Sequence, residues 1–273
     1  AAVDAANRLA QEDNKAVHFK PLINAVLRRI TREGEAVLES LDSTKITMPD
    51  WMWKRLSAHY GEQMARAIAE AHLNRPPLDL VFGSDDDPLL NSLNGNRIAP
   101  GRLRLSEAGK VDALEGYQEG RWWVQDFAAS LPAQLLGNIK GSRVVDLCAA
   151  PGGKTAQLAS MGGKVIAVDI SKHRSHIVRG NLARLNLSAE LIVADARDWR
   201  PDVPVPFVLL DAPCTATGTV RRHPELPWIK RAADITAQES LQRELLDAAA
   251  EMISSGGTLV YAVCSLEPEE CVE

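Results

Sequence analysis

Two cysteines stand where a thiol could do covalent chemistry. Cys214 lies three residues after Asp211, at the end of one apolar segment, and Cys264 directly follows another, Tyr261–Val263. A cysteine thiolate is a strong nucleophile, and nearby cations or a helix N-terminus lower the pKa of the thiol. A lone cysteine is more often a small buried apolar residue. Two cysteines expected at one edge of a sheet favour a chemical role.

A metal site is not expected. The chain has four cysteines but no C-x-x-C spacing, and Cys264 and Cys271 are seven positions apart. His173 and His176 fall three apart among basic residues, which is typical of a solvated helix face. Free thiols suit a reducing compartment, so a cytoplasmic protein is predicted.

The segment Asp146–Thr155, with the sequence DLCAAPGGKT, predicts a strand, a tight turn and a helix. Its small residues let a ligand approach the backbone, and the helix N-terminus offers free N–H groups to an anion such as a carboxylate. It lacks the G-x-G-x-x-G pattern of dinucleotide sites, and Cys148 stands where a phosphate loop has its first glycine. A merely tight turn is the alternative interpretation.

Aspartates follow three successive expected strands, at Asp169, Asp195 and Asp211. In a parallel sheet all three project from the same edge as the glycine-rich turn. An acid after the second strand suits a ribose diol, one after the third an adenine amino group, and one after the fourth an ammonium group. This set fits S-adenosylmethionine better than NAD, because no pyrophosphate has to be bound. Each aspartate alone could be a turn residue or a helix cap.

The elements that would position these residues alternate between strand and helix after Arg143. Strands are expected at 144–147, 165–168, 191–194, 207–210 and 258–263, with helices from 154, at 171–185 and at 236–253. This alternation predicts an α/β fold with a parallel, doubly wound sheet. Before it we expect helices at 1–30 and 50–71, a mixed or β-rich connector at 78–120, and a helix near 125–137.

The composition is that of an ordinary globular protein. Of 273 residues, 45% are hydrophobic and 25% charged, and 31 Lys and Arg against 36 Asp and Glu give a net charge of −5. These values exclude a disordered or collagen-like chain and lean against a nucleic-acid partner. Local basic clusters at 172–184, 217–225 and Lys20–Arg32 could still contact phosphates, or could be solvated surface. The apolar runs are too short to span a bilayer, so no membrane partner is expected.

The motifs together resemble one family, the RNA cytosine-5 methyltransferases, and within it the bacterial 16S ribosomal RNA branch often called the Fmu or Sun type. The resemblance rests on Asp146–Thr155, Asp169, Asp195, Asp211–Cys214 and Tyr261–Glu270. Trp122–Asp126 resembles the entry to that family's catalytic domain, and Phe19–Ile30 resembles the end of its NusB-like RNA-binding domain. The resemblance covers nearly the whole chain and implies a Rossmann-like class I methyltransferase domain.

The resemblance also implies a division into three parts. Residues 1–48 would be a remnant of the NusB-like helical domain with a linker, 49–140 a small α+β connector, and 141–273 the S-adenosylmethionine-dependent methyltransferase domain. Family members are longer at both ends, so we expect the chain to start inside the NusB-like domain and to lack the last strands of the sheet. The segment Thr215–Gly218 departs from the family's usual Ser-Gly-x-Gly, which would stiffen that loop.

The implied activity is methyl transfer from S-adenosylmethionine to carbon 5 of a specific cytosine in 16S ribosomal RNA. Cys264 would add to carbon 6 as the nucleophile, Cys214 would assist product release, and Asp211 would bind the methionine amino group and the cytosine edge. Lys154 would hold the cofactor carboxylate, Asp169 the ribose and Asp195 the adenine. The implied cofactor-binding residues are Cys148, Ala149, Ala150, Pro151, Gly152, Gly153, Lys154, Asp169, Arg174, Asp195 and Asp211.

The expected partner is small-subunit ribosomal RNA, met at a single-stranded or loop cytosine, because such a base leaves its stack cheaply. A monomer is expected. One alternative is a non-catalytic RNA-binding or ribosome-assembly protein that keeps a methyltransferase fold. Another is a small-molecule or protein methyltransferase, which would not need the two cysteines.

Overall fold

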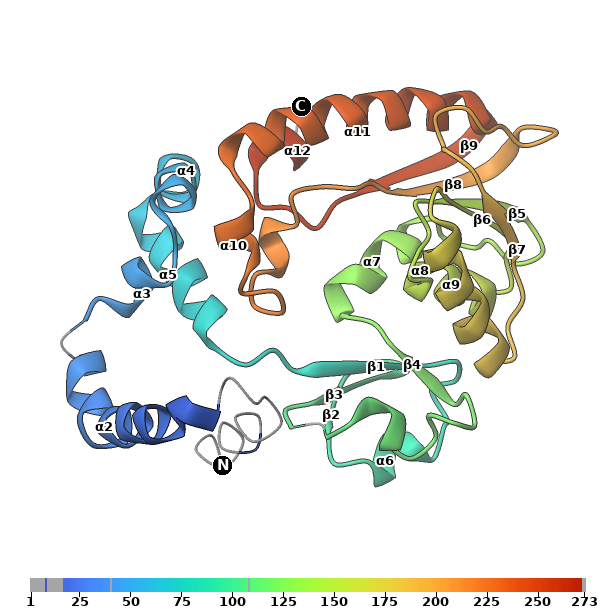
Figure 1. Cartoon of the computed structure of the whole chain (residues 1–273). Coiled ribbons are helices and arrows are strands. Elements are labelled where there is room, and N and C mark those ends of the chain that lie inside the picture. The colour runs from blue at the N-terminus through green and yellow to red at the C-terminus, as the bar shows by residue number, and fades with distance from the viewer. Residues whose placement is uncertain (1–7, 9–16, 40, 108, 272–273) are drawn as a thin grey trace.

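The computed structural model describes residues 8, 17–39, 41–107 and 109–271. Over these residues the chain runs from a group of helices through a four-stranded sheet into a larger layered unit built on five strands (Figure 1). Within this part of the chain, no helix is long and apolar enough to cross a membrane.

The N-terminal helices differ from the prediction in their boundaries. A short 3-10 turn, η1 (Val17–Phe19), leads into α2 (Lys20–Glu39), followed by α3 (Ser43–Ile46), α4 (Asp50–Tyr60) and α5 (Glu62–Leu73). The helix expected at 1–30 therefore continues to Glu39, while residues 1–7 and 9–16 lie outside the described residues. The single helix expected at 50–71 is wrong. Gly61 has a φ of 81°, a left-handed conformation that ends α4 and redirects the chain.

The turn-rich stretch after α5 forms an antiparallel sheet in the order β2-β3-β1-β4. Its strands are β1 (Leu78–Phe82), β2 (Asn96–Ala99), β3 (Arg102–Leu105) and β4 (Trp122–Val124), with α6 (Leu89–Ser92) and η2 (Val111–Ala113) in the connections. Leu80, Leu103 and Trp122 are buried in its core. Buried Asp79 binds Arg104 within this sheet and accepts a hydrogen bond from the Phe127 backbone, which ties the sheet to the next helix.

The C-terminal half contains a five-stranded parallel sheet in the order β7-β6-β5-β8-β9. The strands are β5 (Arg143–Leu147), β6 (Lys164–Asp169), β7 (Glu190–Val193), β8 (Val205–Asp211) and β9 (Ile253–Ala262). The helices are α7 (Phe127–Leu135), α8 (Gly153–Ser160), α9 (Lys172–Arg184), α10 (Leu226–Ile229), α11 (Ala232–Met252) and α12 (Pro268–Cys271), with the short η3 (Thr217–Thr219). The predicted doubly wound α/β fold is confirmed.

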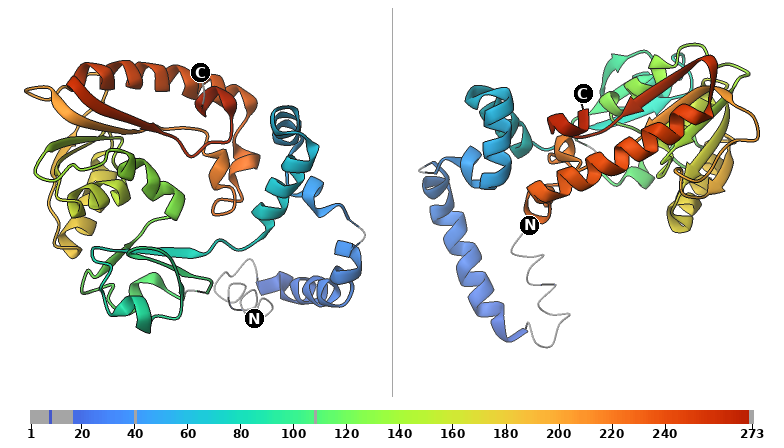
Figure 2. Two further views of the ribbon diagram at one scale, coloured as in Figure 1. Left: turned by 180° about the vertical axis from the view of Figure 1, so that it is seen from behind. Right: turned by 90° about the horizontal axis from the view of Figure 1, so that it is seen from above.

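Helices cover both faces of this sheet because its strands are apolar on both sides. Val145 and Leu147 pack with Met252 of α11, whereas Val144, which precedes Val145, packs with Leu158 of α8 on the opposite face. Figure 1 shows α11 on one side of the sheet and α8 and α9 on the other, and the rear view in Figure 2 shows the same layering.

The strand order creates one switch point. From β5 the chain crosses to β6 and then β7 on one side, and afterwards returns to place β8 and β9 on the other side of β5. Ligands of open α/β sheets bind beyond the carboxyl ends of the strands at such a point. Asp146, Asp169 and Asp211 all lie at or near these carboxyl ends.

Candidate active site

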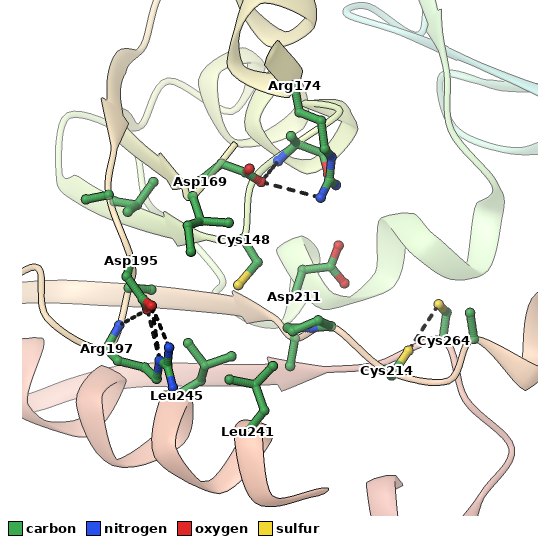
Figure 3. A pocket seen from close by; sticks show the side chains of 18 residues that line it. Cys148, Asp169, Arg174, Asp195, Arg197, Asp211, Cys214, Leu241, Leu245 and Cys264 are labelled. Carbon is green, nitrogen blue, oxygen red and sulfur yellow. Dashed lines mark hydrogen bonds and ion pairs between the residues drawn. The ribbon is translucent and has the colours of Figure 1, made fainter. Parts of the chain in front are cut away.

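A cavity of about 340 Å³ opens at the carboxyl ends of β5, β6 and β8. Figure 3 shows its labelled side chains converging from the carboxyl ends of the five strands and the loops after them, from α9 and from α11. It is lined by eight of the residues that the sequence nominated: Cys148, Ala150, Asp169, Arg174, Asp195, Asp211, Cys214 and Cys264.

Five other nominated residues lie elsewhere. Ala149 is buried in the core between the sheet and α7 and α8. Pro151, Gly152 and Gly153 line a separate cavity of about 170 Å³ on the far side of the turn. Gly152 has a φ of 100°, and a Cβ there would lie only 3.0 Å from the Val178 side chain, so glycine lets α9 pack against the turn. Lys154 lines the neighbouring cavity that is described below as the second cavity.

Asp169 fastens the turn to the end of β6. One carboxylate oxygen accepts the Ala150 backbone N–H at 3.0 Å, and the other accepts the Ser171 N–H at 2.9 Å. The Arg174 guanidinium donates to the Ala150 carbonyl and lies 4.0 Å from the same carboxylate. The side chain that the sequence assigned to a ribose therefore also shapes the wall that a ribose would meet.

Cys148 is not a candidate nucleophile, although it lines the cavity. Burial, followed by the nearby carboxylate of Asp169, raises the pKa of its thiol to about 12. At neutral pH it is therefore a neutral thiol that offers the cavity a small apolar surface.

Asp146 is fully buried beneath the turn. The Thr155 hydroxyl donates to one of its oxygens at 2.6 Å, and the other oxygen has no hydrogen-bond partner among the described residues. Burial raises the pKa of this carboxyl to about 7. The site therefore holds a carboxyl group that is partly protonated near neutral pH.

We expect Asp146 to make the folded chain less stable as the pH rises. Its pKa is about 7 when folded and 3.8 ordinarily, so between these values the folded state keeps a proton that the unfolded state has lost. The free energy of unfolding should fall by about 2–3 kcal/mol from pH 5 to pH 8 through this group. Denaturant unfolding at both pH values measures it, and Asp146→Asn should flatten the slope. An equally steep slope in the variant would contradict this assignment.

Asp195 enters the cavity already paired. Arg197 binds its carboxylate at 2.7 Å and also binds Glu244 of α11 at 2.7 Å. The hydrogen bonds from Arg197 lower the pKa of Asp195 below its ordinary value. Sequence reasoning did not single out Arg197, nor Leu241 and Leu245, which also line the cavity. The two leucines are four apart on α11 and could have been found from helical spacing, whereas nothing in the sequence marks Arg197.

Asp211 and Cys264 are shared with the neighbouring cavity of about 470 Å³, which Lys154 also lines. The Lys154 ammonium binds the Asp211 carboxylate at 2.8 Å. This second cavity is lined by further basic side chains: Arg104, Arg221 and Arg222. The two cavities therefore meet at a carboxylate, and one thiol faces both.

The sulfurs of Cys214 and Cys264 lie 3.4 Å apart, as free thiols joined by a hydrogen bond. That hydrogen bond lowers the pKa of Cys214, and the same bond together with burial raises the pKa of Cys264. The two thiols titrate as one pair, in which the first proton leaves more easily than from an isolated thiol and the second less easily. The pair can thus carry one thiolate while its second member keeps a proton.

A buried carboxylate joins the two cysteine loops. Glu270, only 2% exposed, accepts hydrogen bonds from the Thr215 backbone at 2.8 Å and from the hydroxyls of Thr215 and Ser265. Gln242 of α11 donates to it at 3.1 Å. Because Thr215 follows Cys214 and Ser265 follows Cys264, this network fixes both thiols relative to each other.

Gly218 fits against the Cys264 backbone. Its N–H donates to the Cys264 carbonyl at 3.0 Å, and a Cβ at Gly218 would lie 2.8 Å from that oxygen. Gly218→Ala should lower the free energy of unfolding by about 1–3 kcal/mol, the usual cost of overpacking. Gly180→Ala is the matched control, because a methyl group inside α9 meets nothing within 4 Å and should stabilise by about 0.5–1 kcal/mol. Equal effects in urea unfolding would refute the close approach at Gly218.

The strand order and the cavity at its switch point define a Rossmann-like methyltransferase fold. A solved structure of a methyltransferase homolog protein from Pyrococcus horikoshii is 30% identical, with a TM-score of 0.69 over 80% of this chain and 73% of that one. NSun6 from the same organism shares the fold, with a TM-score of 0.73 and 20% identity over 81% of this chain and 84% of that one.

The family model for the 16S rRNA methyltransferase RsmB/F matches residues 133–273. Ribosomal RNA small subunit methyltransferase B of Vibrio vulnificus is 40% identical over 277 residues, which cover 95% of this chain and 65% of that protein. The protein of the same name from Pseudomonas putida is 42% identical over 93% of this chain and 62% of its own length. The chain thus spans somewhat less than two thirds of these relatives. It belongs to the RsmB/F family of 16S rRNA methyltransferases, as the motifs predicted.

Proposed function

We propose that this protein transfers a methyl group from S-adenosylmethionine to carbon 5 of a cytosine in 16S ribosomal RNA. The observation that carries the proposal is the thiol pair, 3.4 Å between sulfurs, in which Cys214 lines the first cavity and Cys264 lines both cavities beside Asp211. One cavity would take the methyl donor and the other the target base. A methyltransferase that acts on a more nucleophilic atom would have no use for a pair of thiols at this point.

The first cavity suits S-adenosylmethionine in size and donor set. Small-molecule sites are typically about 300–1,000 Å³, and this cavity is about 340 Å³. We assign the ribose hydroxyls to Asp169, the adenine to the side of the cavity formed by Asp195 and Arg197, and the amino-acid end to Lys154 and Asp211. When bound, S-adenosylmethionine supplies the methyl group as an electrophilic sulfonium carbon.

Cys264 would activate the cytosine. Either sulfur can hold the proton that the pair shares, so the thiolate stands on Cys264 when that proton is on Cys214. The Cys264 thiolate adds to carbon 6, forming a carbon–sulfur bond and moving the electron pair of the 5,6 double bond onto carbon 5, which becomes the nucleophile. Carbon 5 takes the methyl group, leaving the sulfonium sulfur as a neutral thioether. A base then removes the proton from carbon 5, the double bond re-forms, and the sulfur of Cys264 leaves carbon 6 as a thiolate. Cys214, 3.4 Å away, would assist this release, for which its thiol can hold or deliver a proton.

The second cavity suits an RNA strand. Arg104, Arg221 and Arg222 place guanidinium groups around it, and their positive charge favours a phosphate backbone. The Arg222 guanidinium is fixed by Asp126 at 2.6 Å. A flipped cytosine, cheapest to extrude from a loop or single strand, would reach Cys264 and Asp211 from this side. We further expect a monomer that acts in the cytoplasm.

Incubation with protein-free 16S ribosomal RNA and S-adenosylmethionine labelled in the methyl group tests the function. The expected product is 5-methylcytidine in the digested RNA, at a position that bisulfite sequencing locates. Label in another nucleoside would overturn the cytosine assignment. RNA binding without any cofactor binding at millimolar S-adenosylmethionine would instead favour a non-catalytic assembly protein.

Asp169→Ala should weaken cofactor binding by about 10- to 100-fold, the usual effect of losing a charged hydrogen bond of about 1.5–3 kcal/mol. Titration calorimetry with S-adenosylmethionine measures the change. Asp202→Ala is the control, because this exposed aspartate pairs with Arg143 and lies outside the cavity lining. Equal affinities for the two variants would remove Asp169 from the cofactor site.

A further inference from the structure

Helix α4 contacts the segment that follows Cys264 through charged hydrogen bonds. Arg55 of α4 donates from Nε to Glu267 at 2.5 Å and from Nη2 to both oxygens of Glu269 at 2.6 Å. The Glu267 side chain is 1% exposed, and its second oxygen has no hydrogen-bond partner among the described residues. Arg55 is thus the cation that neutralises a buried carboxylate three residues after Cys264.

Other side chains of α4 contact the same loop and its neighbour. The Tyr60 hydroxyl donates to the Leu266 carbonyl at 2.8 Å, and the Trp51 indole donates to the Pro227 carbonyl at 2.9 Å. Met52 and Leu56 are buried in one apolar cluster with Val220, against which Leu266 packs. Helix α4 therefore docks on the two loops that frame the second cavity.

On its inner side the same segment is bonded to the loop that carries Cys214. Thr217 Oγ1 accepts the Leu266 N–H at 2.9 Å, and the Gly218 N–H binds the Cys264 carbonyl. Leu266 is therefore held from both sides, by Tyr60 on α4 and by Thr217. Because Ser265 follows Cys264 directly and the Cys264 carbonyl accepts the Gly218 N–H, we expect a movement of Ser265–Glu269 to displace Cys264.

We propose that Arg55 is a positioning residue for Cys264. By clamping Glu267 and Glu269, it lets the N-terminal helices set where the thiol stands relative to Cys214 and Asp211. The Arg55 guanidinium contacts two side chains, Glu267 and Glu269, that are two positions apart in the chain. We therefore expect this segment to have little freedom to rotate while both contacts are made. The inference rests on the proposed function only in its activity readout.

The test uses a double variant, Arg55→Met with Glu267→Gln. The second change removes the buried charge that Arg55→Met alone would leave unpaired and that could unfold the protein. Arg66→Met on α5 is the matched control, because Arg66 pairs with Asp42 and Glu62 instead. Arg55→Lys, which keeps the charge but not the forked geometry, is a second, milder variant.

Amide hydrogen exchange of 264–270 and the alkylation rate of Cys264 by iodoacetamide report on the clamp without any methyl transfer. We expect both to rise about tenfold in the double variant and less in Arg55→Lys, with the control unchanged. The kcat should fall by about 10- to 100-fold while the KM for S-adenosylmethionine stays within about twofold, as misplacement of a reacting group predicts.

If both Arg55 variants show the hydrogen-exchange and alkylation rates of the wild type, the positioning role of Arg55 is refuted, whatever their methyl-transfer activity. If hydrogen exchange and alkylation rise as expected in the variants but the wild-type protein transfers no methyl group, the proposed function is contradicted and the positioning role of Arg55 is retained. A fall in kcat equal to that of Arg66→Met would show that Arg55 has no special link to Cys264.

Discussion

Cys264→Ala should abolish methyl transfer to RNA while leaving cofactor binding within about twofold of wild type. Without the thiol no bond forms to carbon 6, and carbon 5 of cytosine stays too poor a nucleophile to attack the methyl group. Losing a covalent nucleophile typically costs about 10³-fold or more in rate. Single-turnover transfer of labelled methyl to 16S ribosomal RNA measures the loss, and calorimetry with S-adenosylmethionine measures binding.

Cys271→Ala is the matched control for this experiment. It removes a thiol from α12 that lies outside the lining of both cavities. Its activity should stay within about threefold of wild type. A Cys264→Ala protein that still methylates RNA would refute the nucleophile assignment and shift attention to Cys214. Loss of cofactor binding in Cys264→Ala would show instead that the substitution damages the first cavity.

The residues at the carboxyl edge of the sheet were predictable because their positions depend on short stretches of sequence. Asp169 and Asp211 end apolar strands, and Cys214 and Cys264 lie just after apolar strands. Parallel strands bring their carboxyl ends to one edge whatever the conformation of the loops. Periodicity and the residue types at strand ends therefore sufficed to place these four residues in the cavity lining. The glycine-rich turn was also identifiable, but which of its faces meets the cavity was not, since Pro151, Gly152 and Gly153 face away.

The contacts that tune the site could not be predicted, because they join residues far apart in the chain. Arg55 and Glu267 are separated by 212 positions, and no sequence pattern links them. Arg197 meets Glu244 across 47 positions. The spacing of the two thiols depends on the Glu270 network, whose members come from three separate segments. Such partners are selected by the packing of the whole fold, not by propensity or period.

Cys214→Ala should trap the protein covalently on its RNA. If Cys214 assists release, its loss leaves methylated cytosine attached to Cys264 after the methyl group has been transferred. The adduct should appear as a band of reduced mobility in a denaturing gel, dependent on both RNA and S-adenosylmethionine. Multiple turnover should fall by about 10²-fold or more, the scale of losing a proton-transfer group, while a single round of transfer proceeds.

The double variant Cys214→Ala with Cys264→Ala separates the two roles. It should form no adduct, because the trapped bond belongs to the sulfur of Cys264, although the loops and their Glu270 network remain. An adduct in Cys264→Ala, together with loss of methyl transfer in Cys214→Ala, would exchange the roles of the two thiols. The 3.4 Å contact makes that exchange chemically conceivable, since either sulfur can hold the shared proton. The nucleophile is distinguished from its partner only by which single variant, Cys214→Ala or Cys264→Ala, accumulates the adduct.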